Sequence, residues 1–257
     1  MAILNWAGID SALRGASSFF NFDSMLFNMR FTRRSDLSAS AALCYIEPDA
    51  PTGLSIFKKG ANIMPNSIAV FCGSREGASP AYMESARALG LEMAKRGITL
   101  VYGGSRVGLM GAVADAVLDN GGSAIGVLPT FMQTREIAHL GLTELIMVES
   151  MHERKAKMAE LAEGFVTLPG GSGTMEEYFE VFTWAQLGLH TKPIGVLNAA
   201  GYYDPLIALF DRMTGEGFVT PQHREILLTA QEPSALLDQM QAYRAPEVPQ
   251  ILTEERT

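Results

Sequence analysis

The sequence predicts an α/β fold: a doubly wound, Rossmann-like parallel sheet with helices on both faces. From residue 67 onward, short apolar runs alternate with segments of helical periodicity, and glycine-rich turns follow several of the runs. Short continuous apolar runs are typical of strands that are buried in a parallel sheet. Their alternation with helices predicts right-handed crossovers, and ligands in such folds bind at the carboxyl ends of the strands.

Six strands are expected in the folded part of the chain, with helices between or after them. The strands are predicted at residues 68–72, 98–102, 124–128, 145–148, 165–168 and 193–197. The helices are predicted to begin at Pro80 and after Gly108, and to cover residues 151–161, 174–187, 205–213 and 234–240. The order of strand, glycine turn and helix thus repeats along the chain.

Local residues mark the ends of the first two helices. Ser79 can cap the first helix, Pro80 can open it, and Gly97 is placed to end it. The second helix follows a glycine turn at residues 103–108 and stops near Gly121. These residues at the helix ends support one helix between the first and second predicted strands and another between the second and third.

The chain divides into three parts. Residues 1–63 show no sustained alternation of strands and helices, and we expect them to form a poorly ordered N-terminal extension. Met64 begins the Rossmann-like domain, which extends to residue 243. Residues 244–257 form a polar C-terminal tail that is expected to fray.

Composition excludes several classes of partner. A net charge of −8 gives no general basic field that attracts polyanions, so nucleic acid is not expected to bind, although local amides can still hold a small anion. No apolar run approaches the roughly 20 residues that cross a bilayer, so no membrane partner is expected. Cys44 and Cys72 form no disulfide framework, and the four histidines show no metal-ligand spacing. We expect a soluble, cytoplasmic protein without a metal.

A glycine-rich loop, PGGSGTMEE at residues 169–177, directly follows a predicted buried strand and leads into a helix. Glycines tolerate positive φ and allow a ligand to approach the backbone, and the first amides of a helix attract an anion. The Thr174 hydroxyl adds a donor. A tight turn without a ligand would account for an isolated glycine cluster, but this context favours a phosphate site.

One of the two glutamates after this loop is expected to face the ligand. Thr174 and Glu177 lie three residues apart and share a helix face, whereas Glu176 is rotated by about 100° from Glu177. A carboxylate in the first helical turn is stabilised in its ionised form. Glu177 is therefore expected to act as an anion in catalysis, and helix capping explains Glu176 better.

Basic residues begin the helix that precedes the glycine-rich loop, in the segment MHERKAK at residues 151–157. Arg154 offers a planar fork that suits a phosphate or the edge of a ligand, and Lys155 is a point charge. A solvated basic helix face is the alternative. The turns at residues 103–108 and 73–75 could also line the pocket, but the first fits a dinucleotide fingerprint poorly, and a purely structural role is equally open for the second.

These motifs resemble the LOG (Lonely Guy) family of cytokinin riboside 5′-monophosphate phosphoribohydrolases, whose hallmarks are PGGxGTxxE and an upstream MHxRK-type segment. Both motifs are present at residues 169–177 and 151–155. The segments FCGS at 71–74, YGG at 102–104 and TWAQLG at 183–188 are similar as well. The resemblance covers about residues 67–241 and leaves the N-terminal extension without a counterpart.

The resemblance implies hydrolysis of the N-glycosidic bond of a nucleoside 5′-monophosphate, without a cofactor. It implies that Arg154 and Glu177 are the catalytic pair. It also implies a homodimer, for which apolar helix surface near residues 179–189 is available. The residues that it implies for contact with the substrate are Glu136, Arg154, Lys155, Gly171, Ser172, Gly173, Thr174, Met175, Glu176, Glu177 and Thr183.

Two other functions are associated with similar folds or sequences. Similar folds carry nucleotides or the molybdenum cofactor without cleaving them, so a carrier protein is the alternative to the enzyme. Relatives of this kind have also carried the label lysine decarboxylase, which requires a lysine Schiff base with pyridoxal phosphate. Neither Lys155 nor Lys192 has such a setting in the sequence. The choice between AMP and a prenylated adenosine monophosphate stays open.

Overall fold

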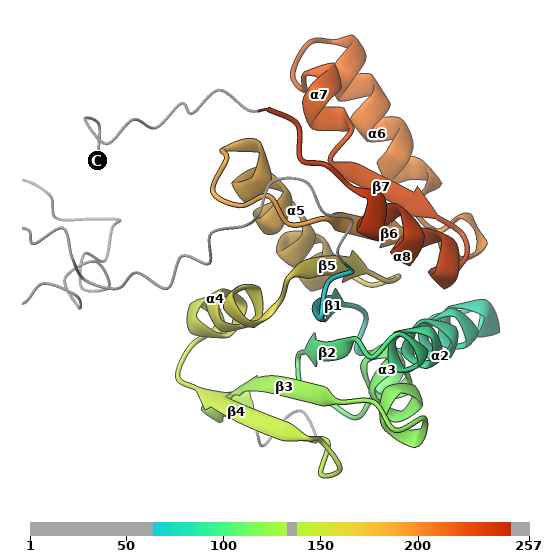
Figure 1. Ribbon diagram of the computed structural model, residues 1–257, viewed down its shortest axis with the longest axis vertical. Helices are drawn as coiled ribbons and strands as arrows, with labels where there is room; N and C mark the ends of the chain where they lie inside the picture. Colours follow the sequence, from blue (N-terminus) through green and yellow to red (C-terminus); the bar gives the residue numbers. More distant parts are fainter. Residues whose placement is uncertain (1–63, 133–137, 248–257) are drawn as a thin grey trace, which may run out of the picture. The chain divides into compact units, whose positions relative to one another are not determined.

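Seven parallel strands form one sheet in the computed structural model, which describes residues 64–132 and 138–247 (Figure 1). Within it, the order is β4-β3-β2-β1-β5-β6-β7, so the direction of strand addition reverses between β1 and β5. The strands are β1 (Ser67–Phe71), β2 (Thr99–Tyr102), β3 (Ala124–Pro129), β4 (Glu144–Val148), β5 (Gly164–Thr167), β6 (Ile194–Leu197) and β7 (Leu227–Ala230).

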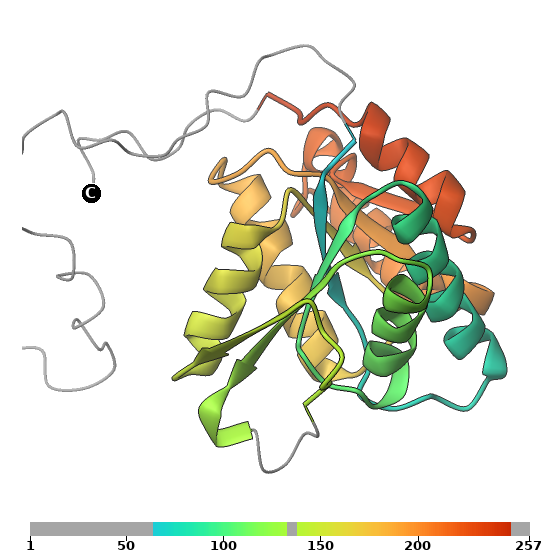
Figure 2. The ribbon, with the colours of Figure 1, turned by 60° about the horizontal axis from the view of Figure 1, so that its bottom comes forward.

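Helices cover both faces of this sheet, which confirms the predicted doubly wound α/β fold (Figure 2). One face carries α2 (Pro80–Lys95), α3 (Gly108–Asp119) and α8 (Pro233–Ala242). The other face carries α4 (Met151–Leu161), α5 (Ser172–Gln186) and α6 (Asp204–Gly215). A short helix, α7 (Pro221–Arg224), and two 3-10 turns, η2 (Thr130–Met132) and η3 (Ala199–Gly201), complete the described elements.

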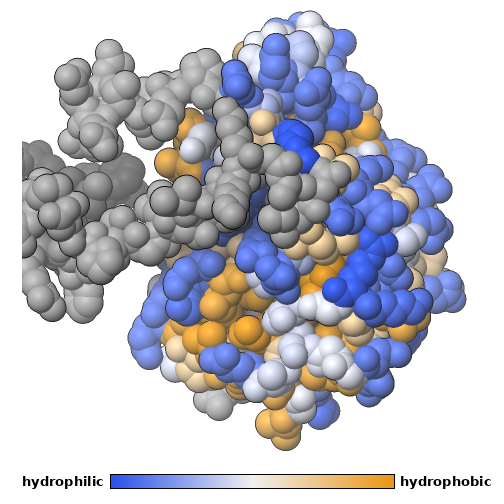
Figure 3. Space-filling model, viewed as in Figure 1, coloured by the Kyte–Doolittle hydropathy of each residue, from blue (hydrophilic) through white to orange (hydrophobic). Residues whose placement is uncertain are grey.

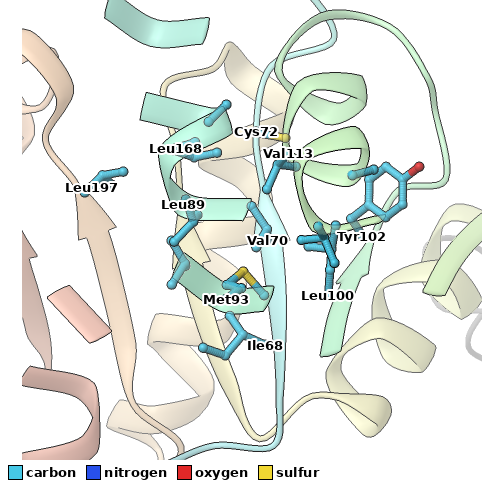
Figure 4. Packing of buried hydrophobic residues seen from close by; sticks show 14 of the residues in the cluster. Ile68, Val70, Cys72, Leu89, Met93, Leu100, Tyr102, Val113, Leu168 and Leu197 are labelled. Atoms are coloured by element: carbon cyan, nitrogen blue, oxygen red, sulfur yellow. The ribbon is translucent and has the colours of Figure 1, made fainter. Parts of the chain in front are cut away.

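Alternating side chains of β1 divide the core into two layers. Ile68 and Val70 belong to the layer with α2, α3 and α8, and Figure 4 shows them on the side of the strand that faces α2 and α3. Ala69 and Phe71 belong to the layer with α4, α5 and α6. All four side chains are at most 4% exposed. A strand that is apolar on both faces can lie only in the centre of a covered sheet, which is why β1 is central.

The structure differs from the expected elements at several places, among them β7, the short helix α7 and the start of α5. The strand β7 was not predicted, because four residues containing Thr229 give too short an apolar run to distinguish a strand from a loop. Helix α5 begins at Ser172 rather than at residue 174. Glu176 and Glu177 therefore lie in the second turn of α5 and not in the first.

The edge of the sheet at β4 is less covered than its centre. Met147 on β4 is 37% exposed, and Figure 3 shows hydrophobic residues at the surface between α4 and this edge. In the described parts of the chain, no helix is long and apolar enough to cross a membrane. The described residues all belong to one compact unit, Lys59–Thr257, whereas residues 1–63 lie outside the described part.

Candidate active site

A cavity of about 610 Å³ lies where the strand order reverses, at the carboxyl ends of β1 and β5. The loop after β1 and the glycine-rich loop after β5 line it, and the Gly73 N–H donates to the Pro169 carbonyl at 3.0 Å between them. Leu109 N–H in turn donates to the Gly73 carbonyl at 3.1 Å, which joins the start of α3 to the same loop. This switch point is where doubly wound proteins bind their ligands.

The first turn of α5 presents its backbone to this cavity. Gly171 caps the helix without a side-chain hydrogen bond, and no partner for the N–H groups of Ser172, Gly173 and Thr174 occurs in the described residues. A Cβ on Gly171 or Gly173 would have no protein atom within 4 Å. Free amides beside open space at a helix N-terminus form a site for an anion such as a phosphate.

Of the two reasons predicted for the glycines of this loop, a positive φ and close approach of a ligand, the structure contradicts the first. None of Gly170, Gly171 and Gly173 has a positive φ. Gly170 is needed because a Cβ there would overlap Thr174 Oγ1 and lie 2.9 Å from the Gly73 nitrogen. Close packing of the two loops, and room for a ligand, therefore explain the glycines better than backbone strain.

Two tyrosine hydroxyl groups donate hydrogen bonds to backbone carbonyls at the glycine-rich loop. Tyr203 Oη donates to the Leu168 carbonyl at 2.7 Å, and Tyr202 Oη donates to the Gly170 carbonyl at 2.6 Å. The Asn198 side chain fixes the turn that carries them by accepting from the Tyr203 N–H at 2.7 Å. Both loop carbonyls are thereby directed to hydroxyl groups, while the amides that follow face the cavity.

Arg154 reaches the cavity from the start of α4. Ser150 caps this helix by accepting from the Glu153 N–H at 3.1 Å, and the Arg154 side chain is only 6% exposed. Its Nε has no hydrogen-bond partner, and no ion pair with a carboxylate occurs in the described ranges. Within the described part of the chain, its guanidinium donates one hydrogen bond, from Nη1 to the Met151 sulfur at 3.8 Å. A buried guanidinium that is not hydrogen-bonded to a carboxylate favours binding of an anionic ligand.

Glu177 lines the same cavity and has an unusual pKa. Burial raises the pKa of Glu177 to about 7, although the nearby Arg154 lowers it. This differs from the expected ionised carboxylate, because the effect of the helix dipole is confined to the first turn and Glu177 lies in the second. Burial also raises the pKa of the Cys72 thiol beside Glu177, so the neutral thiol is favoured.

Lys155 and Glu176 form a bridge between α4 and α5. Lys155 Nζ is hydrogen-bonded to Glu176 and, at 3.1 Å, to Glu180. Burial opposes the charge of Lys155, but these two carboxylates raise its pKa above the ordinary value. Lys155 is absent from the cavity lining, whereas Glu176, which it binds, lines the cavity.

The other predicted contact residues lie in different places. Gly171, Ser172, Gly173 and Thr174 line the cavity, whereas Met175 packs against the core layer of α4, α5 and α6. Thr183 is exposed and lies about 14 Å along the axis of α5 from Thr174. Glu136 lies outside the described residues. The structure thus brings the loop, Arg154 and Glu177 together, but not Thr183.

Sequence reasoning missed several residues of the cavity. Tyr82, Tyr202 and Met132 line it, as do Met110, Met151 and Met158 around Arg154. Tyr82 and Tyr202 meet edge to face, with ring centroids 5.5 Å apart. Met151 opens the segment MHERKAK, but the other tyrosines and methionines belong to no motif, so no sequence signal could have found them. Among the described residues, no group of three or more histidines, cysteines or carboxylates could hold a metal ion.

The fold and this cavity define an α/β protein with a phosphate-type site at its switch point, and comparisons identify the family. A family model described as "Possible lysine decarboxylase" matches residues 110–240. The LOGL1 protein of Oryza sativa subsp. japonica is 49% identical over 176 residues, which cover 68% of this chain and 79% of that protein.

Two further relatives carry the name cytokinin riboside 5′-monophosphate phosphoribohydrolase. LOG7 of Arabidopsis thaliana is 47% identical over 184 residues, covering 72% of this chain and 84% of LOG7. The enzyme of Rhodococcoides fascians is 48% identical over 169 residues, covering 65% of this chain and 85% of that enzyme. The chain therefore belongs to the LOG family of phosphoribohydrolases.

Solved structures with a similar fold show low sequence identity. The molybdenum cofactor binding protein of Rippkaea orientalis has a TM-score of 0.54 and 21% identity, covering 68% of this chain and 95% of that chain. The molybdenum cofactor carrier protein of Chlamydomonas reinhardtii has a TM-score of 0.53 and 20% identity, and the match covers 69% of this chain and 98% of that chain. At this identity the similarity establishes the shared fold, and the function of those proteins does not carry over.

Proposed function

We propose that this protein hydrolyses the N-glycosidic bond of a nucleoside 5′-monophosphate, a cytokinin riboside 5′-monophosphate or AMP. The observation that carries this proposal is the cavity in which free helix amides, the unpaired Arg154 and the carboxyl of Glu177 meet. Relatives with 47–49% identity support it, and they favour the enzyme over a cofactor carrier.

The reaction requires water and no cofactor. The bond between C1′ and the base nitrogen breaks with its electron pair on the base, and the water oxygen bonds to C1′. One proton of the water reaches the base, so the products are the free base and ribose 5-phosphate. With a pKa of about 7, Glu177 can accept the proton from water near neutral pH, and as an anion it stabilises positive charge on the ribose.

The phosphate is assigned to the start of α5. The amides of residues 171–174 and the Thr174 hydroxyl fix it, while Arg154 binds the phosphate or steadies the departing base. Binding energy from the phosphate, which does not react, then holds C1′ beside Glu177. Glu136, Met175 and Thr183 remain proposed substrate contacts on the basis of the family resemblance alone.

We also propose that the protein is a cytoplasmic homodimer that binds neither nucleic acid nor membranes. Thr183 cannot reach the cavity of its own chain without a long extension of the ligand, so its proposed contact fits a site completed by a second copy. Leu187 and Leu189, just beyond α5, are 37% and 61% exposed and supply apolar surface. The net charge of −8 supports the exclusion of nucleic acid.

Base release separates the enzyme from the carrier. Purified protein is incubated with AMP or with N6-isopentenyladenosine 5′-monophosphate, and the free base and ribose 5-phosphate are measured. If the protein is the enzyme, the free base and ribose 5-phosphate form in equal amounts. The ratio of the rates with the two nucleotides reveals the preferred base. Nucleotide that binds without any base release would contradict the enzyme and support a carrier.

A further inference from the structure

The backbone of Gly103 packs directly against the Arg154 guanidinium. A Cβ on Gly103 would overlap Arg154 Nη2 and would lie 3.1 Å from Cζ. The same Cβ would lie 3.2 Å from the Met110 sulfur. Gly103 has no positive φ, so its backbone conformation does not require glycine. The space for Arg154 is the reason for a glycine at this position.

Little else fixes the place of this guanidinium. Neither the hydrogen bonds nor the ion pairs of the described residues include a carboxylate partner for Arg154, and its Nε is buried without a partner. Sulfur atoms and backbone surround it instead, from Met110, Met151 and Gly103. A cation that is held by shape rather than by a salt bridge moves when the shape of its site changes.

We propose that Gly103 is a positioning residue for the hydrolysis: the absence of a side chain there places Arg154 beside Glu177 and the start of α5. The inference rests on the proposed function and adds a residue that the motifs around Arg154 and Glu177 do not include. Gly103 itself does not need to touch the reacting atoms, because it acts through the side chain of Arg154.

The position of Arg154 also affects the carboxyl of Glu177. Burial raises the pKa of Glu177, and the charge of Arg154 opposes this rise. Displacing the guanidinium therefore raises the pKa of Glu177 further, and the ionised carboxylate forms only at higher pH. The charged and titratable groups that face Glu177 are Arg154 and Lys155 on α4, Glu176 and Glu180 on α5, and Cys72 after β1.

The substitution Gly103→Ala tests this inference. The clash is with the far end of a flexible side chain, so the fold is expected to persist with an unchanged midpoint of thermal unfolding. We expect kcat/KM for base release to fall on the order of 100-fold, and the midpoint of its pH profile to move to higher pH. Gly215→Ala is the matched control, because a Cβ there meets no atom within 4 Å and Gly215 lies at the end of α6.

Measurements of base release and of the Glu177 pKa together separate a failure of the proposed function from a failure of the role proposed for Gly103. Wild-type protein that releases no base contradicts the proposed function, but the pKa of Glu177, measured by carbon NMR of the carboxyl, still tests Gly103. An unchanged Glu177 pKa in Gly103→Ala would overturn the positioning role, as would a kcat/KM within twofold of wild type in an active enzyme.

A double variant covers the case in which Gly103→Ala fails to fold. Removing the arginine side chain in Gly103→Ala/Arg154→Ala relieves the overlap, so this variant is expected to fold and to match Arg154→Ala in activity. A double variant that still unfolds would show that Gly103 serves the backbone itself and would overturn the inference.

Discussion

At the scale of single residues, two effects shift the pKa of Glu177 in opposite directions. Burial favours the neutral carboxyl and raises its pKa to about 7, whereas Arg154 favours the carboxylate. Burial is the larger effect, because Glu177 lies beyond the first turn of α5 and makes no hydrogen bond within the described residues. This balance places the titration of Glu177 near neutral pH, where a general base works best.

The pH dependence of turnover follows from this pKa. If the carboxylate is the working form, kcat/KM rises with pH and reaches half of its plateau near pH 7. Initial rates of base release between pH 5 and 9 measure the midpoint. A rate that falls as pH increases through this range would instead assign Glu177 the role of a proton donor.

Stability should respond to Glu177 in the opposite direction to activity. Its folded-state pKa is raised above the ordinary 4.5, so its contribution to stability is present at low pH and is lost between about pH 4.5 and 7. Glu177→Gln avoids this loss, so we expect it to be more stable than wild type by about 3 kcal/mol at pH 8 and about equally stable at pH 4. Urea unfolding at the two pH values measures the difference.

The same variant separates binding from turnover. Glu177→Gln should abolish base release and retain nucleotide binding, measured by calorimetry. Glu180→Gln is the matched comparison, because Glu180 lies on the same helix and pairs with Lys155 but does not line the cavity. Turnover that is unchanged in Glu177→Gln would remove Glu177 from the mechanism.

At the scale of elements, the start of α5 depends on the turn after β6. Tyr202 and Tyr203 come from this turn, and each hydroxyl binds one carbonyl of the glycine-rich loop. Ala200 in the same turn has a φ of 49°, which is strained for a residue with a side chain. The strain is maintained where the turn presents both tyrosines to the loop.

Removing one of these hydroxyls should weaken phosphate binding. Tyr202→Phe loses the hydrogen bond to the Gly170 carbonyl, and we expect inorganic phosphate and the nucleotide to bind roughly fivefold more weakly, from about 1 kcal/mol for one hydrogen bond. Titration calorimetry with phosphate measures this change. Stability should change little, since Tyr202 is 39% exposed.

The neighbouring tyrosine provides the contrast. Tyr203→Phe leaves the buried Leu168 carbonyl without its partner and is expected to lower the free energy of unfolding by about 1–3 kcal/mol. If Tyr202→Phe instead lost stability and kept its affinity for phosphate, the tyrosine would support the fold rather than the binding loop.

Much of this arrangement could be predicted from the sequence, because it depends on local patterns. The apolar runs gave six of the seven strands, and the glycine-rich loop was placed correctly after β5. The start of α5 was misplaced by two residues, and with it the expected charge of Glu177. The burial of Glu177 depends on segments that are distant in the sequence, such as those carrying Gly103 and Tyr202. No local sequence pattern reveals such contacts.

At the scale of the whole molecule, the strand order brings the two motifs to one cavity. Helix α4 follows β4 and helix α5 follows β5, so both helices begin on the side of the sheet where the parallel strands have their carboxyl ends. The chain order indicated this proximity, because the basic start of α4 precedes the strand that ends in the glycine-rich loop. The reversal of strand addition between β1 and β5 explains why the cavity lies there.

The proposed dimer is tested at this scale as well. Leu189→Asp places a charge on the apolar surface beyond α5, and we expect the sedimentation coefficient to fall from that of a dimer to that of a monomer. Leu140→Asp is the control, because Leu140 is 93% exposed and lies far along the chain from this surface. A monomeric wild type, or a dimer that tolerates Leu189→Asp, would contradict an interface at residues 179–189.

The central claim is that the start of α5 anchors a phosphate so that Glu177 acts on the sugar. The most direct measurement compares kcat/KM for a nucleoside 5′-monophosphate with that for the same nucleoside without its phosphate. We predict that the monophosphate is cleaved at least on the order of 100-fold more efficiently, because the anchoring energy is lost with the phosphate. Equal cleavage of both compounds, or cleavage of neither, would contradict the account.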